Sequence, residues 1–309
     1  MKHPIFFEPK NTLNLFCLQD KLNFLISLYK KNNLPKVLLL TGDKGSGKST
    51  LVNHFLHLIY DEINYKKYNK ISEISPFFKQ FIQDIFSNII YLKGSDYKNI
   101  KIEDIRNLKH KLRQSTTLDG ERFIILDDVE LFNKNSLNAL LKIIEEPGKN
   151  FFILINNKSK PILETIKSRS IEIKMILSHQ EKLMITNNLI ELFNLKPALN
   201  YKSTNLSPGN FIKFDYILNS NNINISDDYI TNLSVLLNLY KKNKDILFIN
   251  IAFFLTDYYF KNEYEKDFLN SNNIYEIKKF IFNNLNDFLM LNLNQFSLLN
   301  SISNKLRYG

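Results

Sequence analysis

A glycine-rich stretch decides how this chain folds: Gly42-Asp43-Lys44-Gly45-Ser46-Gly47-Lys48-Ser49-Thr50. An apolar, strand-like run precedes it at residues 37–41, and residues 49–56 follow with apolar side chains at helical spacing. A strand, such a loop and a helix in this order predict a phosphate-binding loop. All nine residues are therefore candidate ATP ligands, with Lys48 reaching the β- and γ-phosphates and the Ser49 hydroxyl binding Mg²⁺. The alternative is a glycine-rich turn that binds nothing.

The composition indicates a globular protein, since 44% of its 309 residues are hydrophobic and 13% are aromatic. The chain has no long apolar run, and residues 1–8 lack the apolar segment of a secretion signal, so we expect a cytoplasmic location and no membrane partner. The single cysteine, Cys17, excludes an internal disulfide and a cysteine-rich zinc site.

The net charge of +10 suits a polyanionic partner such as nucleic acid. However, the lysines are scattered through a chain that is also crowded with Asn and Ile, and a biased genome explains this composition equally well. Charge alone therefore leaves both interpretations open.

Up to about residue 175, short hydrophobic runs alternate with helical patterns, which predicts an α/β domain with a parallel sheet. The expected strands are residues 37–41, 123–126, 151–155 and 171–175, with a weaker candidate near 89–92. We expect helices to cover both faces of the four stronger strands, because these runs are apolar or β-branched. Residues 63–97 are expected to be mostly helical.

From Ser178 onward only helical patterns remain, and segments rich in helix breakers interrupt them at residues 203–209 and 219–222. The expected helices of the last segment are residues 228–242, 245–260, 272–291 and 293–306. We therefore predict three domains, at residues 1–175, 176–225 and 226–309. The first is α/β and the last is all-α.

A second nucleotide-binding element is the apolar run Phe123-Ile124-Ile125-Leu126 that ends in Asp127-Asp128, a Walker B pattern. Asp127 is expected to hold Mg²⁺ beside the phosphate loop. Asp128 stands where many ATPases carry a glutamate that polarises the attacking water. Because its side chain is shorter, we expect ATP binding with inefficient turnover. The simpler alternative is a turn at the end of a strand.

A third element, residues 135–147, has apolar side chains at helical spacing, which predicts a helix packed on the sheet and ended by Pro147. The pair Glu145-Glu146 is expected to be solvated. Within this element, Asn138-Ala139-Leu140-Leu141-Lys142 followed by Glu145-Glu146-Pro147 resembles the signature of the clamp-loader branch of AAA+ proteins.

Two later segments carry the same resemblance. Asn156 and Asn157 match the polar position called sensor 1 in that family, and Ser168-Arg169-Ser170 resembles its Ser-Arg-Cys motif, with Ser170 in place of the cysteine. The resemblance implies an AAA+ domain that binds ATP and Mg²⁺, a small helical lid and a helical collar that joins subunits. It also implies that Arg169 acts as an arginine finger at a neighbouring subunit's ATP site.

Among clamp loaders the chain resembles bacterial DNA polymerase III delta-prime subunits more than the gamma/tau motor. It has Asp127-Asp128 where the motor has Asp-Glu, and Leu206-Ser207-Pro208-Gly209-Asn210 lacks the motor's sensor 2 arginine. This implies a replication subunit that helps to load a sliding clamp on primer-template DNA, together with gamma/tau and delta subunits. Its own ATPase would be weak or absent.

Two alternatives remain open from the sequence: an ATP-hydrolysing motor of the gamma/tau kind, and an interaction scaffold with a vestigial phosphate loop. The four-cysteine zinc module of many relatives cannot exist here, because the chain has one cysteine. Residues 63–100 replace that module without an assignable role.

Overall fold

The computed structural model describes residues 3–94, 100–113, 120–266 and 271–308. Their contacts divide the chain into two units. One comprises Lys2–Asn194 and Leu206–Phe211, and the other consists mainly of Leu195–Asn205 and Ile212–Gly309. The predicted boundaries at 175 and 225 define a three-part division that stays a prediction.

The first unit is built on a parallel sheet of five strands in the order β2-β3-β4-β1-β5. The strands are β1 Val37–Thr41, β2 Ile89–Lys93, β3 Arg122–Asp127, β4 Asn150–Asn156 and β5 Ile171–Lys174. Every predicted strand is present, including the weaker candidate near 89–92. Because the strands are parallel, their carboxyl ends meet at one edge of the sheet, and the phosphate loop follows β1 at that edge.

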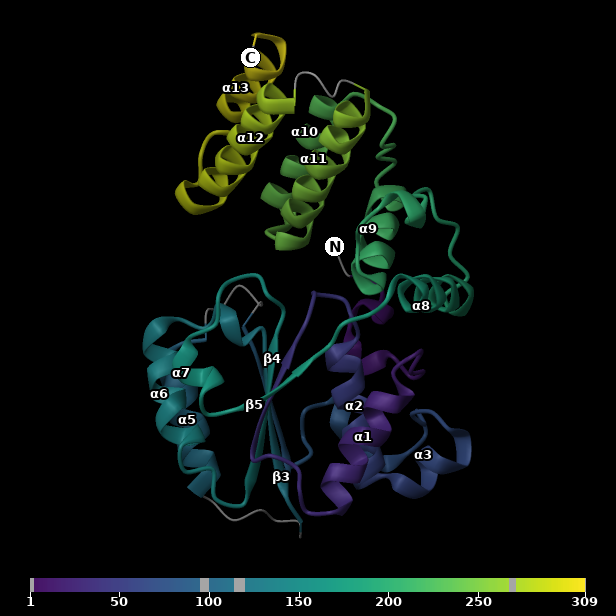
Figure 1. Ribbon diagram of the computed structural model, residues 1–309, viewed down its shortest axis with the longest axis vertical. Helices are drawn as coiled ribbons and strands as arrows, with labels where there is room; N and C mark the ends of the chain where they lie inside the picture. The colour runs from purple at the N-terminus through teal and green to yellow at the C-terminus, as the bar shows by residue number, and fades with distance from the viewer. Residues whose placement is uncertain (1–2, 95–99, 114–119, 267–270, 309) are drawn as a thin grey trace. The chain divides into compact units, whose positions relative to one another are not determined.

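Helices cover both faces of this sheet (Figure 1). One face carries α1 Gln19–Lys30, α2 Lys48–Tyr60, α3 Glu62–Tyr68 and α4 Pro76–Ile82, and the other carries α5 Ile102–Arg113, α6 Lys134–Ile144 and α7 Glu164–Lys167. Successive side chains of a strand point to opposite faces, so each strand contributes to both hydrophobic cores. In β1, Leu38 and Leu40 pack on the first face and Leu39 packs on the second. This unit also contains α8 His179–Leu192.

Short 3₁₀ turns complete the first unit at η1 Ile5–Phe7, η2 Pro9–Asn11 and η3 Val129–Leu131. The prediction of a mostly helical segment at 63–97 is confirmed for α3 and α4, whereas its later part forms β2. Residues 95–97 lie outside the described ranges.

The prediction that all four stronger strands are covered on both faces is wrong for β5. Ile171 is 59% exposed, and the residues of this strand are exposed or half-buried. The physical reason is position: β5 is an edge strand that pairs with β1 alone, so fewer helices reach it. Its sequence, Ile171-Glu172-Ile173-Lys174, alternates apolar and charged residues accordingly.

The second unit is helical. It contains the turn η4 Tyr201–Ser203 and the helices α10 Tyr229–Asn243, α11 Ile246–Lys266, α12 Ser271–Leu291 and α13 Gln295–Tyr308. Helix α9 Pro208–Ser220 begins in the first unit and continues into the second. The predicted fold class, a parallel α/β domain followed by helices, is therefore confirmed. None of the helices in the described ranges combines the length and the apolar composition that crossing a bilayer requires.

Candidate nucleotide-binding site

The glycine-rich loop connects β1 to α2 and is shaped by two glycines in the left-handed region. Gly45 has φ of 82° and Gly47 has φ of 87°, values that a side chain would strain. Gly47 caps α2, and the first N–H groups of that helix have no acceptor within it. These donors and the positive end of the helix dipole lie at the carboxyl edge of the sheet, an arrangement that attracts phosphate.

Lys48 is buried, with 2% of its surface exposed, and its ammonium group lies inside the loop. Nζ donates to the carbonyl oxygens of Gly42 and Asp43, both at 2.7 Å, and lies 3.4 Å from Ser46 Oγ. Burial lowers the pKa of Lys48 from 10.5 to about 8, although nearby carboxylates, Asp127 first among them, oppose the shift. Near neutral pH the loop therefore presents a cation where phosphate oxygens would lie.

Ser49 and Asp127 form the part of the site suited to a metal. Ser49 Oγ donates to Asp127 Oδ2 at 2.9 Å, and the N–H of Asp128 donates to Asp127 Oδ1 at 2.9 Å. The same carboxylate accepts a bond from Tyr91, a residue that no pattern in the sequence pointed to. One hydroxyl and one carboxylate fit Mg²⁺, which keeps several waters and takes few protein ligands. Thr50 follows Ser49 in the same helical turn.

No group of three or more His, Cys, Asp or Glu side chains in the described ranges is arranged to bind a metal ion by itself. A magnesium ion would therefore be held through Ser49, Asp127, water and the phosphates of a nucleotide, as in other phosphate-loop sites.

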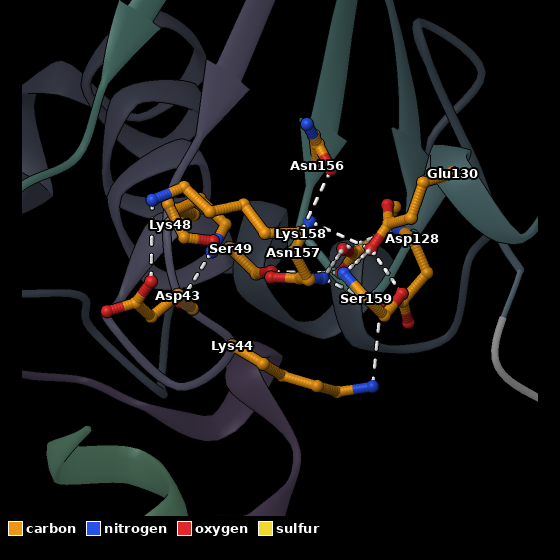
Figure 2. Close-up of polar contacts among 12 residues, drawn as sticks. Asp43, Lys44, Lys48, Ser49, Asp128, Glu130, Asn156, Asn157, Lys158 and Ser159 are labelled. Atoms are coloured by element: carbon orange, nitrogen blue, oxygen red, sulfur yellow. Dashed lines mark hydrogen bonds and ion pairs between the residues drawn. The ribbon is translucent and has the colours of Figure 1, made fainter. Parts of the chain in front are cut away.

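Asp128 lies beside the loop, but its carboxylate is already engaged (Figure 2). Asn157 Nδ2 donates to Asp128 Oδ1 at 2.7 Å, and Lys44 Nζ lies 3.4 Å from the same oxygen. The backbone of Asp128 is left-handed, with φ of 53°, at the start of η3. An amide and an ammonium group therefore both contact the same oxygen of the Asp128 carboxylate.

The two predicted sensor residues behave differently. Asn157 Nδ2 points to both aspartates, at 2.7 Å from Asp128 Oδ1 and 3.4 Å from Asp127 Oδ1. Asn156 is buried, and its side chain accepts the N–H of Lys158 at 2.9 Å, so it shapes the turn after β4. The structure therefore brings Asn157, and not the Asn156 side chain, onto the aspartates.

Glu130 is a site residue that the sequence did not identify. It is buried in η3, and its Oε1 accepts the N–H of Asn157 at 3.0 Å, the N–H of Ser159 at 3.3 Å and the Ser159 hydroxyl at 2.8 Å. These bonds hold the turn that carries Asn157. An acidic residue two positions after Asp128 is the only signal in the sequence, and acidic residues at strand ends are common.

The segment Leu206–Phe211 packs against the phosphate loop at Lys44 and Gly45. The Gly209 N–H donates to Gly45 O at 3.0 Å, and the Ser207 hydroxyl donates to Lys44 O. A Cβ on Gly45 would lie 2.5 Å from Ser207 Oγ and 2.7 Å from the backbone nitrogen of Asn210. This is the segment that lacks the sensor 2 arginine of the motor subunits. It contacts the loop through the small residues Ser207 and Gly209.

Arg169 lies just after α7 and is bound at the end of α6. Its Nε and Nη2 contact Glu145 Oε1 at 2.8 Å and 2.7 Å, and its Nη1 donates to Thr165 O at 3.0 Å. Glu145 and Glu146 are exposed, as expected, and the turn after α7 also brings a cation to Glu145. About a third of the Arg169 side chain, 36%, stays exposed.

One family model and several known proteins are similar to this chain. A family model described as "DNA polymerase III, delta subunit" matches residues 18–178, more than half of the chain. DNA polymerase III subunit delta' of Pseudomonas aeruginosa is 37% identical over 76 residues, covering 24% of this chain and 23% of that protein. DNA polymerase III subunit gamma of Buchnera aphidicola subsp. Schizaphis graminum is 27% identical over 147 residues, covering 46% and 39%.

The chain thus spans less than half the length of these two curated relatives. Among solved structures, a gamma subunit-related protein of DNA polymerase III from Thermotoga maritima aligns with a TM-score of 0.46 and 16% identity, covering 90% of this chain and 96% of that one.

Proposed function

Because the chain belongs to the DNA polymerase III delta subunit family of AAA+ clamp-loader proteins, we propose that it is a delta-prime-type subunit of the clamp loader in DNA replication. In this role it helps to load a sliding clamp on primed DNA, together with gamma/tau and delta subunits, in the cytoplasm. It is not itself the polymerase. Its own part is to bind ATP and to act on a neighbouring subunit.

ATP binding is supported by the phosphate loop and the residues around it. The left-handed glycines, the buried ammonium group of Lys48 and the bond from Ser49 to Asp127 are all in place. These groups provide donors, a cation and metal ligands for a Mg²⁺-nucleotide. Bound Mg²⁺ would neutralise phosphate charge, and Lys48 would neutralise more of it from inside the loop.

The observation that carries the delta-prime assignment is the state of Asp128. Hydrolysis needs a carboxylate that orients water, and the Asp128 carboxylate is instead held by Asn157 and Lys44. The segment 206–210 adds no arginine to the phosphate site. We infer that this chain holds ATP and turns it over slowly or not at all.

Arg169 supplies the second half of the proposal, an arginine finger that acts on the adjacent subunit. Its guanidinium is partly exposed and lies against Glu145, with no bond to the phosphate loop of this chain in the described contacts. A guanidinium in this position is available to a phosphate brought by a partner, whose greater charge competes with the single carboxylate of Glu145.

A binding and turnover assay tests the nucleotide part of the proposal. The isolated chain should bind a labelled ATP analogue saturably in the presence of Mg²⁺, and Lys48→Ala should abolish binding, whereas Lys142→Ala on the exposed surface of α6 should not. Slow or undetectable hydrolysis fits a delta-prime role. Rapid hydrolysis by the chain alone would favour the gamma/tau-like motor, and no binding at all would favour the scaffold.

Reconstitution tests the assembly and the arginine finger. The chain should co-purify with gamma/tau and delta subunits, and a loader with Arg169→Ala should assemble normally but lose most of its DNA-stimulated ATPase. Lys167→Ala is the matched control, because this neighbouring cation pairs with the exposed Glu164 on the same helix. Equal activity of the Arg169→Ala and control loaders would refute the finger.

A further inference from the structure

The metal-binding part of the site contains a contact that the phosphate-loop pattern does not explain. Tyr91 Oη donates to Asp127 Oδ2 at 2.7 Å, and Ser49 Oγ donates to the same oxygen at 2.9 Å. We propose that Tyr91 is a positioning residue, whose hydroxyl orients the Asp127 carboxylate for a Mg²⁺-nucleotide. This inference rests on the proposed nucleotide-binding function and adds a residue to its site.

The register of the sheet places Tyr91 within reach of Asp127. Strands β2 and β3 pair in parallel, with Tyr91 beside Ile125 and Lys93 beside Asp127. Two residues along a parallel strand correspond to about 6.6 Å. A tyrosine side chain that leans along its strand spans this distance, whereas a serine or threonine does not.

Tyr91 also lies on the correct face of the sheet. It packs on the core that includes α2, together with Ile89, whereas Ile90 and Leu92 pack on the opposite core. Ser49 lies in the first turn of that same α2 helix. The hydroxyls of Tyr91 and Ser49 therefore meet Asp127 from two different elements, and both fix its Oδ2 atom.

A lysine side chain lies against the tyrosine ring. Lys10 Nζ lies 5.1 Å from the centre of the Tyr91 ring and 5.4 Å from that of Phe81, and it pairs with Asp84. A cation against an aromatic face restricts the ring. Phenylalanine could fill the same space, so the hydroxyl is the feature of Tyr91 that serves Asp127.

The Asp127 carboxylate is held on both of its oxygens. Oδ2 accepts the Tyr91 hydroxyl at 2.7 Å and the Ser49 hydroxyl at 2.9 Å. Asp127 Oδ1 in turn accepts the N–H of Asp128 at 2.9 Å, so the carboxylate is fixed through both oxygens.

The test is Tyr91→Phe in the full chain, with Tyr60→Phe as a matched control. Tyr60 Oη donates to the Glu121 carbonyl at 2.5 Å, just before the first residue of β3, so the control loses a comparable bond at the opposite end of that strand. Binding of ATPγS is measured by titration calorimetry with Mg²⁺ and, separately, with EDTA.

Tyr91→Phe is expected to raise the dissociation constant in Mg²⁺ about tenfold, the scale of one hydrogen bond to a charged group. With EDTA it should change by less than about twofold, because the carboxylate then has no metal to place. Tyr60→Phe should match the wild type in both conditions. A loss equal in Mg²⁺ and EDTA, or no loss in Mg²⁺, would overturn the role of Tyr91. Absence of Mg²⁺-dependent binding by the wild type would overturn the nucleotide-binding function as well.

Discussion

Gly45→Ala should reveal how strongly the segment 206–211 is bound to the phosphate loop. Gly45 has φ of 82°, and an added Cβ would lie 2.5 Å from Ser207 Oγ, 2.7 Å from the Asn210 nitrogen and 3.1 Å from Asn210 Oδ1. Two of these three atoms belong to the backbone or to a short side chain, so the segment must move away from the loop.

Two contributions determine how much Gly45→Ala lowers the free energy of unfolding. A left-handed alanine costs about 1 to 2 kcal/mol relative to glycine. Displacing the segment breaks the bond from the Gly209 N–H to Gly45 O and the bond from the Ser207 hydroxyl to Lys44 O, which together contribute about 2 kcal/mol. Gly45→Ala should therefore lower the free energy of unfolding by about 3 to 4 kcal/mol.

Gly148→Ala is the matched control. Gly148 has φ of 58°, so it shares the backbone strain, but no heavy atom lies within 4 Å of its added Cβ. It should lose only the first contribution, about 1 to 2 kcal/mol. Urea unfolding followed by far-ultraviolet circular dichroism measures both variants. Equal losses would show that the contact with segment 206–211 contributes nothing, which would refute the reasoning.

Three further variants test individual contacts. Burial lowers the pKa of His57 from 6.5 to about 4, so the folded state resists its protonation and loses stability as the pH falls below 6.5. Between pH 7 and pH 5, the free energy of unfolding of His57→Leu should therefore fall by about 2 kcal/mol less than that of the wild type, as measured by urea titration. If both proteins lost the same free energy over this range, His57 would not be the cause. Glu145→Gln should lower the free energy of unfolding by less than about 1 kcal/mol, because its pair with Arg169 is partly exposed, and high salt should remove the difference. Glu130→Ala should lower the free energy of unfolding by about 3 kcal/mol, because the buried donors lose their acceptor. It should also speed hydrogen exchange at the backbone N–H of Asn157, and an unchanged exchange rate would contradict this.

Features encoded in contiguous residues could be predicted from the sequence. The phosphate loop depends on glycines at fixed spacing between an apolar run and a helical pattern, so Gly42–Thr50 identified both the loop and the fold class. The strands β1, β3 and β4 are buried apolar runs, and α6 has a periodic apolar face, Pro147 lying three residues beyond its end. Asp127 could be predicted as a site residue because it ends the apolar run of β3.

Contacts between distant segments could not be predicted in this way. Tyr91 meets Asp127 only because β2 pairs with β3 in one register, and Arg169 meets Glu145 only because the turn after α7 returns to the end of α6. Local spacing carries no information on which strand neighbours which. The edge position of β5 has the same cause, although the alternation Ile171-Glu172-Ile173-Lys174 does indicate a partly exposed strand.

The sequence by itself therefore predicted a glycine-rich loop between a strand and a helix and the layering of the first unit, because neighbouring residues encode backbone shape and hydrophobic period. Only the tertiary structure decided how the acidic groups are used: Asp127 is fixed by Ser49 and Tyr91, and Asp128 is held by Asn157 and Lys44. The chemistry of a carboxylate depends on the charges and donors that surround it in space, and folding brings those groups from three other parts of the chain: the loop and start of α2, strand β2, and the turn after β4.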